Sequence, residues 1–92
     1  MKVYLAGKIS GLNMGAVFEK FSAAEFILKR DGHTVVNLLR LVSQKWTWEK
    51  CMKACIAELI KCDAIYLLPD WYESQGAKLE FYIAQELKLT VI

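Results

Sequence analysis

The stretch Asp63-Ala-Ile-Tyr-Leu-Leu68 is a short and almost continuous apolar run. It begins at a charged residue and is followed directly by Pro69, the only proline of the chain. Strands that are covered on both faces have such continuous apolar runs, whereas half-exposed strands alternate apolar and polar residues. We therefore expect this stretch to be a central strand of a parallel sheet.

Three further runs have the composition of strands. Lys2 to Ala6 is apolar, Thr34 to Asn37 contains β-branched residues, and Thr90 to Ile92 ends the sequence. The segment from Leu38 to Trp46 shows no clear period, so we expect it to be irregular or partly helical. Together with the central run, these segments predict about four strands.

Three segments between the strand-like runs have apolar residues at helical spacing. We expect the first helix over Ala16 to Arg30, ended by Gly32. The second begins at a Thr47 cap and runs to about Lys61, and the third, from about Gln75 to Leu87, is capped by Ser74. In the first two helices, the residues expected to face the core are Phe18, Phe21, Ala24, Ile27, Leu28, Trp48, Met52, Cys55, Leu59 and Ile60.

This alternating order of strands and helices predicts an α/β fold. We expect residues 1–92 to form a single three-layer α/β/α domain of the Rossmann or flavodoxin type, with parallel strands. Ligands of such sheets bind outside the carboxyl ends of the strands. Three segments meet at that edge, Gly7 to Gly11, Asn37, and Pro69 to Gly76, so we expect the functional site there.

Glu80 lies where the pattern of its own helix predicts an apolar residue. At roughly 100° per residue, it falls within the apolar arc of that helix and away from the polar side. Burying an unpaired, ionised carboxylate against a core costs several kcal/mol of folding free energy, unless the group becomes protonated. A catalytic or ligand-contacting role is therefore predicted, the alternative being a slightly rotated helix whose glutamate reaches a backbone donor or solvent. The arc consists of Ala77, Leu79, Phe81, Ile83, Ala84 and Leu87.

The composition bears on assembly and partners. The chain has 92 residues, of which 55% are hydrophobic, and a net charge of +2. So small a domain cannot hide so much apolar surface, so we expect a homodimer or a higher homo-oligomer. There is no run of lysine and arginine to follow a nucleic acid polymer. No apolar segment is long enough to span a membrane and no signal peptide is recognisable, so we expect a cytoplasmic protein.

The three cysteines do not have the spacing of a metal or haem motif. Cys51 and Cys55 are four residues apart on one expected helix, where a disulfide would be strained, and Cys62 follows it. We expect reduced thiols, with no metal and no cofactor.

Several residues near the expected site have two interpretations. The glycine loop from Gly7 to Gly11 either offers backbone N–H groups to an anion or is an ordinary strand-to-helix turn. Ser74 either caps its helix or helps to bind an anion at the helix N-terminus, and these roles are compatible. Trp71 either stacks on a flat base or packs against the protein. We expect Trp46 and Trp48 to be packing residues.

Three motifs carry a resemblance to a known family. They are Tyr4-Leu-Ala-Gly-Lys-Ile-Ser-Gly11, Cys62-Asp-Ala-Ile-Tyr-Leu-Leu-Pro-Asp-Trp71 and Ser74-Gln-Gly-Ala-Lys-Leu-Glu80. They resemble a bacterial and phage family of unknown function within the nucleoside 2-deoxyribosyltransferase superfamily. The resemblance extends from Lys2 to Ile92, and the third motif is its most specific part.

The resemblance implies a site and a reaction. Glu80 would be the nucleophile that attacks the anomeric carbon of a sugar, and Ser74 would contact a 5′-phosphate. A neighbouring subunit would help to close each site. The predicted function is an N-glycosidase (a hydrolase) or deoxyribosyltransferase acting on a nucleoside or nucleoside 5′-monophosphate. The predicted substrate-binding residues are Tyr4, Gly7, Lys8, Ile9, Ser10, Gly11, Asn37, Asp70, Trp71, Ser74 and Gly76.

The chain departs from the family pattern at several positions. The family usually has proline at Lys8, an Asn-Pro at Asn37-Leu38 and glycine at Asp70. It has an aspartate near the leaving base where this chain has Cys55. A thiol with a pKa of about 8.5 is a poor replacement for that acid, so we expect Cys55 to be a core residue. Asp70 is a candidate for a substitute carboxylate. The alternative prediction is a non-catalytic nucleotide-binding module that retains the pocket and lacks the acid.

Overall fold

The computed structural model describes all residues from Met1 to Ile92 and contains one parallel sheet. Its strands are β1 (Lys2–Ala6), β2 (Thr34–Val36), β3 (Ala64–Leu67) and β4 (Thr90–Val91). The strand order is β2-β1-β3-β4, with all neighbouring strands parallel. The apolar run that includes β3 is therefore central, as its composition predicts.

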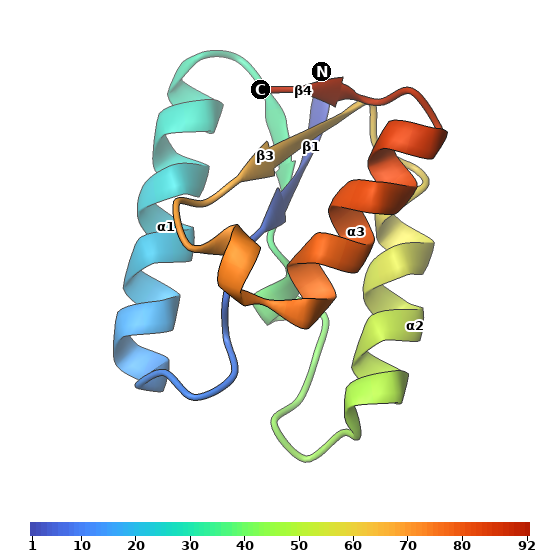
Figure 1. The fold of residues 1–92 in the computed structure, drawn as a ribbon. Helices are drawn as coiled ribbons and strands as arrows, with labels where there is room; N and C mark the ends of the chain where they lie inside the picture. The colour runs from blue at the N-terminus through green and yellow to red at the C-terminus, as the bar shows by residue number, and fades with distance from the viewer.

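Three helices cover the two faces of this sheet (Figure 1). They are α1 (Met14–Arg30), α2 (Trp48–Leu59) and α3 (Gln75–Glu86). Helix α1 lies on one face and α2 and α3 lie together on the other, so the predicted three-layer α/β/α architecture is confirmed. Two single 3-10 turns, η1 (Leu38–Arg40) and η2 (Trp71–Glu73), lie in the segments that follow β2 and β3.

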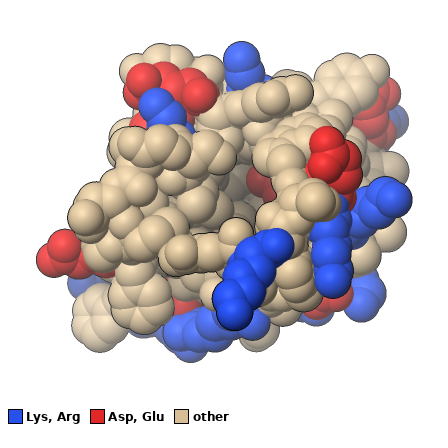
Figure 2. Space-filling view, turned by 90° about the horizontal axis from the view of Figure 1, so that it is seen from below, with Lys and Arg blue, Asp and Glu red and all other residues tan.

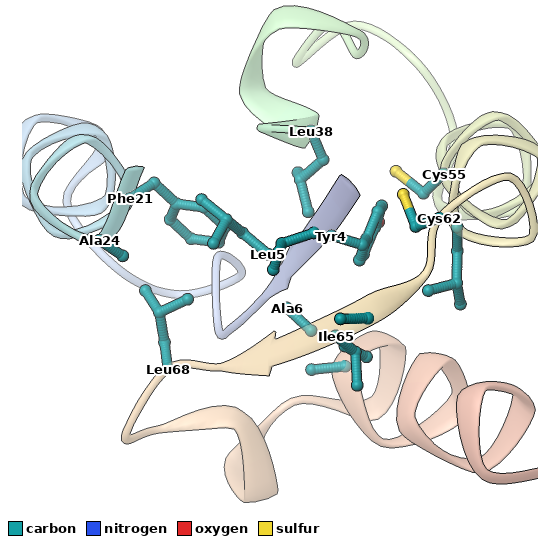
Figure 3. Close-up of a cluster of buried hydrophobic side chains, with 14 of the residues drawn as sticks. Tyr4, Leu5, Ala6, Phe21, Ala24, Leu38, Cys55, Cys62, Ile65 and Leu68 are labelled. Carbon is teal, nitrogen blue, oxygen red and sulfur yellow. The ribbon is translucent and has the colours of Figure 1, made fainter. Parts of the chain in front are cut away.

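The core fills both sides of β1, because alternate residues of a strand point to opposite faces. On the α1 side, Leu5 packs near Phe21 and Leu68 (Figure 3). On the other side, Tyr4 points toward Cys55 and Cys62. All six side chains are buried. The two central strands thus contribute most of their residues to the core, while the short outer strands contribute few.

The helix ends follow the predicted signals. Thr47 Oγ1 accepts a hydrogen bond from Lys50 N–H at 3.2 Å, and Ser74 Oγ accepts one from Ala77 N–H at 3.1 Å. Gly32 has a φ of +92°, which is the left-handed conformation expected just beyond a helix. Helix α1 begins at Met14, two residues earlier than expected, because the side chain of Asn13 caps it.

The expected inward faces of the helices were partly wrong. The structure leaves Phe18 and Ile27 of α1 exposed and buries Val17 and Glu25 instead. The sheet beneath the helices is narrow, since β2 has three residues and β4 has two, and it cannot cover a wide apolar arc. Four other residues with expected inward positions are also exposed. Trp48 and Ile60 were expected to face the core, and Leu79 and Leu87 belong to the expected apolar arc of α3.

The segment after β2 is partly helical, which is one of the two expected outcomes. Asn37 Oδ1 accepts a hydrogen bond from Leu39 N–H at 3.0 Å and thereby caps η1. Leu38, the first residue of η1, is buried against the core.

None of the three helices combines the length and the apolar character that crossing a lipid bilayer requires.

Candidate functional site

A cavity of about 600 Å³ opens at the carboxyl ends of the strands. Figure 2 looks onto this edge of the molecule and shows a hollow near its centre, surrounded mainly by uncharged residues. The volume lies within the range of small-molecule sites. The cavity is lined by Gly7, Ile9, Ser10, Met14, Gly15, Phe18, Leu38, Leu39, Val42, Ser43, Gln44, Trp46, Trp48, Cys51, Met52, Cys55, Ser74, Gly76, Ala77 and Glu80.

Glu80 is the only carboxylate in the lining of the cavity. It lies on α3 with an exposed fraction of 3%. Its Oε2 accepts a hydrogen bond from the hydroxyl of Tyr4 on β1, so its partner is neither a backbone group nor solvent. Burial raises the pKa of Glu80 from its ordinary value of 4.5 to about 7, although the hydrogen bond from Tyr4 acts in the opposite direction.

Tyr4 is fully buried and does not line the cavity. Burial, followed by the negative charge of Glu80, holds the pKa of its hydroxyl well above the ordinary value of 10. The phenol therefore stays protonated at neutral pH and remains a hydrogen-bond donor to Glu80. Because the rigid strand β1 carries it, Tyr4 fixes the position of the carboxylate at the inner wall of the cavity.

Cys55 is buried in the core, as expected, and it also lines the cavity. Its sulfur lies on the side of β1 toward which Tyr4 points (Figure 3). The pKa of this thiol is raised to about 11, chiefly by burial; the Tyr4 hydroxyl acts to lower it, and negative charge on Glu80 acts to raise it. Cys55 is therefore a neutral thiol at physiological pH and a weak proton donor.

An ion pair holds the peptide groups of Lys8 from two sides. Asp70 Oδ1 accepts a hydrogen bond from Lys8 N–H at 3.1 Å, and Lys20 Nζ donates one to the carbonyl oxygen of Lys8 at 2.7 Å. Lys20 and Asp70 also pair with each other. Burial favours a higher pKa for Asp70, but the hydrogen bonds from Lys20 and Lys8 outweigh it and hold that pKa below its ordinary value. This Lys20–Asp70 clamp fixes the loop that carries Gly7 and Ile9.

Six of the twelve predicted site residues line the cavity. Three come from the loop after β1, and three come from α3 and its N-cap residue. Gly7 is also required by packing, because a Cβ there would lie 3.0 Å from Leu68 Cβ and 3.3 Å from Phe21 Cζ. Ser74 caps α3, and this role is compatible with its place in the lining. The six residues are Gly7, Ile9, Ser10, Ser74, Gly76 and Glu80.

The structure places the other predicted residues outside the lining of the cavity. Tyr4 acts through Glu80, and Asp70 belongs to the clamp. The Nζ of Lys8 lies 3.7 Å from Glu73 Oε1. Asn37 Nδ2 donates a hydrogen bond to Glu25 Oε1 at 3.0 Å. The remaining two are Gly11, which has a φ of +79° in the turn after β1, and Trp71, whose ring stacks edge-on against Phe81 with centroids 4.9 Å apart.

Much of the cavity wall was not among the predicted site residues. Phe18, Trp46 and Trp48 were expected to be packing residues, and all three line the cavity. The sequence offered one usable signal, because Trp46 ends the aperiodic segment and Trp48 begins α2 directly after it. Aromatic residues at such a junction, near the carboxyl edge of a sheet, are suited to form one wall of a pocket. The clamp residue Lys20 had no distinguishing signal among the exposed polar residues of α1.

Glu80 is the only group of the cavity lining that is charged at neutral pH. No lysine, arginine or histidine lines it, and its other ionisable groups are the thiols of Cys51 and Cys55. The structure contains no group of three or more His, Cys, Asp or Glu side chains that could hold a metal ion. The arrangement is thus a single carboxylate of raised pKa facing an aromatic and apolar cavity, next to the N-terminus of α3.

Comparisons with known proteins give a family and no assigned activity. A search of curated proteins found no match to this chain. The profile of a family described as a domain of unknown function, DUF4406, matches residues 1–92. Because the match covers the whole chain, the protein belongs to the DUF4406 family.

Proposed function

We propose that the protein is an N-glycosidase or deoxyribosyltransferase that acts on a nucleoside or nucleoside 5′-monophosphate, with Glu80 as the nucleophile. The observation that carries this proposal is a carboxylate of raised pKa, held by a buried tyrosine at the wall of a cavity of about 600 Å³. The three motifs that resemble the nucleoside 2-deoxyribosyltransferase superfamily support it, since Glu80 occupies the position of the nucleophile in that pattern.

The proposed reaction has two displacements at one carbon. A carboxylate oxygen of Glu80 attacks the anomeric carbon, and the bond from this carbon to the base nitrogen breaks. That nitrogen takes the bonding electron pair and a proton from solvent. Water or a second base then attacks the glycosyl ester and gives up its proton to solvent, which restores the carboxylate of Glu80. Each displacement passes through an oxocarbenium-like state, and a nearby negative charge stabilises this state.

The hydrogen bond from Tyr4 suits this role. It occupies Oε2 of Glu80, and the structure gives Oε1 no protein partner, so Oε1 is the oxygen suited to attack. Because the pKa of Glu80 is about 7, a large fraction of the molecules carry an ionised nucleophile at neutral pH. A buried carboxylate with few donors is also more nucleophilic than a fully solvated one.

A second candidate is a non-catalytic nucleotide-binding module, and the absence of a second acid in the cavity favours it. The departing base needs a proton, and the other ionisable groups of the lining are two thiols. Cys55, which occupies the position of the aspartate in the family pattern, has a pKa of about 11. Such a thiol donates a proton slowly at neutral pH. Binding without turnover is the expected behaviour if no other group supplies the proton.

Base release from purified protein tests both candidates. The protein is incubated with ribo- and deoxyribonucleosides and their 5′-monophosphates, and free base is followed by chromatography. For the catalytic candidate, Glu80→Gln should lower the rate of base release by at least about 10³-fold. The matched control is Glu86→Gln, which changes an exposed glutamate of the same helix and should leave the rate unchanged.

The other outcomes decide between the candidates. Thermal stabilisation by a nucleoside or nucleotide without base release supports the binding module. Equal rates of base release in wild type and Glu80→Gln exclude Glu80 as the nucleophile. If no compound of the panel is cleaved and none raises the Tm, both candidates fail.

A further inference from the structure

We infer that the cavity accepts an uncharged nucleoside and excludes the corresponding 5′-monophosphate. This inference rests on the proposed function and narrows its substrate class. It follows from the charges and the aromatic residues around the cavity.

The cavity lacks a cation that could pair with a phosphate, because its lining contains no lysine, arginine or histidine. Two lysines near the cavity pair with carboxylates that do not line it, and a third lies against the ring of Trp46, which does. Lys8 pairs with Glu73, Lys20 pairs with Asp70, and the Nζ of Lys50 lies 4.5 Å from the centroid of the Trp46 ring. In Figure 2, the blue side chains lie around the hollow and not inside it.

The N-terminus of α3 lies in the wall and attracts anions, but it is too weak to hold a phosphate by itself. A helix N-terminus is equivalent to about half a unit of positive charge. A phosphate monoester carries about 1.5 to 2 negative charges at pH 7. Ser74 Oγ already accepts a hydrogen bond from Ala77 N–H, so this N–H group of the first helical turn is not free to bind a phosphate.

A phosphate in the cavity would also oppose Glu80. A second negative charge within a few ångströms raises the pKa of a carboxyl, and the pKa of Glu80 is already raised by burial. The bound phosphate would therefore favour the protonated form of Glu80, which is not nucleophilic. In contrast, an uncharged ligand leaves the ionised form accessible at neutral pH.

The remaining wall suits an uncharged, flat base. Phe18, Trp46 and Trp48 provide aromatic surfaces from α1, from the segment before α2 and from α2 itself. Stacking on such surfaces does not require charge on the base. Ser43 and Gln44, which line the same cavity, can form hydrogen bonds with the polar edge of a base or with a sugar hydroxyl.

Matched pairs of ligands test the inference. The Kd of each nucleoside and of its own 5′-monophosphate is measured by quenching of tryptophan fluorescence in the Glu80→Ala variant, which prevents turnover and retains both cavity tryptophans. This variant also removes the carboxylate, so the same titrations are repeated with wild type in the cold at short times. Because like charges repel strongly in a desolvated site, the monophosphate should bind at least about 10-fold more weakly than the nucleoside to wild type. The difference should be smaller in Glu80→Ala.

A cation introduced into the wall sharpens the test. Gln44→Lys places an ammonium group on the cavity lining at an exposed position, so it should fold normally and reduce the discrimination against monophosphates. Gln85→Lys adds the same charge at an exposed position of α3 outside the cavity and should leave the discrimination unchanged.

Three results would overturn the inference. Monophosphates that bind wild type as tightly as nucleosides do would refute it and leave the proposed function intact. Equal effects of Gln44→Lys and Gln85→Lys would show that overall charge, and not the cavity, sets the preference. No binding by any member of the panel would remove the proposed function and this inference together.

Discussion

Two glutamates of this protein expose almost no surface and have opposite electrostatic surroundings. Glu25 on α1 has an exposed fraction of 4%, and Glu80 on α3 one of 3%. Glu25 accepts hydrogen bonds from Arg40 and Asn37 and pairs with Lys29 at 2.7 Å. Burial alone favours a higher pKa for Glu25, but these partners outweigh it and lower the pKa to about 2. Glu80 has a single uncharged donor, and its pKa is about 7.

The comparison separates a structural carboxylate from a candidate functional one. The partners of Glu25 are a lysine on its own helix and two residues in or next to η1, so the group joins α1 to the segment after β2. Glu80 faces a cavity and lacks a compensating cation. Burial of a carboxylate is therefore not in itself a sign of function. The number of cations that neutralise it is the informative quantity.

The largest expected effect concerns the stability of the protein between pH 4.5 and pH 7. The folded protein keeps Glu80 protonated up to a pKa of about 7, while the unfolded chain loses this proton near 4.5. The stability contributed by Glu80 is therefore fully present below pH 4.5 and is lost as the pH rises to about 7. The loss amounts to about 3 kcal/mol, since one pKa unit corresponds to about 1.4 kcal/mol.

Urea unfolding of wild type and Glu80→Gln, measured from pH 4.5 to pH 8, checks this prediction. Between pH 4.5 and pH 7, the free energy of unfolding of wild type should fall by about 3 kcal/mol relative to that of the variant. Above pH 7, the difference between the two should stay constant. A constant difference between the two free energies throughout the interval would mean that the fold does not raise the pKa of Glu80. This result would contradict the difference between Glu80 and Glu25 described above.

A smaller effect of opposite sign is expected for Glu25. Its folded pKa is below the unfolded one, so its contribution to stability is present above pH 4.5 and is lost as the pH falls toward 2. At pH 7, Glu25→Gln should lower the free energy of unfolding by about 1–2 kcal/mol, a modest value because Arg40 and Lys29 are more than half exposed.

The cost of Glu25→Gln should disappear progressively in acid, which urea unfolding at pH 7, 4 and 3 measures. Glu19→Gln is the matched control, because Glu19 is an exposed residue of the same helix. A constant cost at all pH values would indicate that Glu25 stabilises α1 by packing and not by charge.

The smallest effect is expected for Tyr4→Phe, which keeps the ring and removes the one donor to Glu80. Because this hydrogen bond lowers the pKa of Glu80, its loss should raise that pKa further. The titration of Glu80 is measured by carbon-13 NMR of the carboxyl group. Tyr66→Phe, on the neighbouring strand β3, removes a hydroxyl that does not contact Glu80 and should leave the midpoint in place.

Glu25 also shows what the sequence could not reveal. It lies four residues after Phe21 and three before Leu28, both buried, so it has the same position in an apolar arc as Glu80 has in its own helix. Its cation Arg40 is 15 residues away in the sequence and reaches it only after the chain has turned through β2 and η1. Sequence periodicity identifies a buried carboxylate, but its partners are set by tertiary structure.

The fold itself was largely predictable, because each element has a local signal. Apolar runs marked the strands, and Thr47 and Ser74 marked the starts of α2 and α3. The order of strands and helices also predicted the edge of the sheet at which the cavity lies. It did not predict the residues of the cavity wall. Phe18 and Trp48 have the periodicity of core residues and are exposed because the sheet is narrow.

The Lys20–Asp70 clamp connects two positions at which the sequence departs from the family pattern that it resembles. That pattern usually has proline at position 8 and glycine at position 70. A proline has no N–H to donate to a carboxylate, and its ring fixes φ without help. In this chain the ion pair of Lys20 and Asp70 holds the backbone of Lys8, and ionic strength weakens this electrostatic restraint. The two positions are therefore coupled through the backbone: Asp70 needs an N–H at position 8, which every residue except proline supplies, and replacing Asp70 by glycine would remove the restraint and leave Lys20 without its partner.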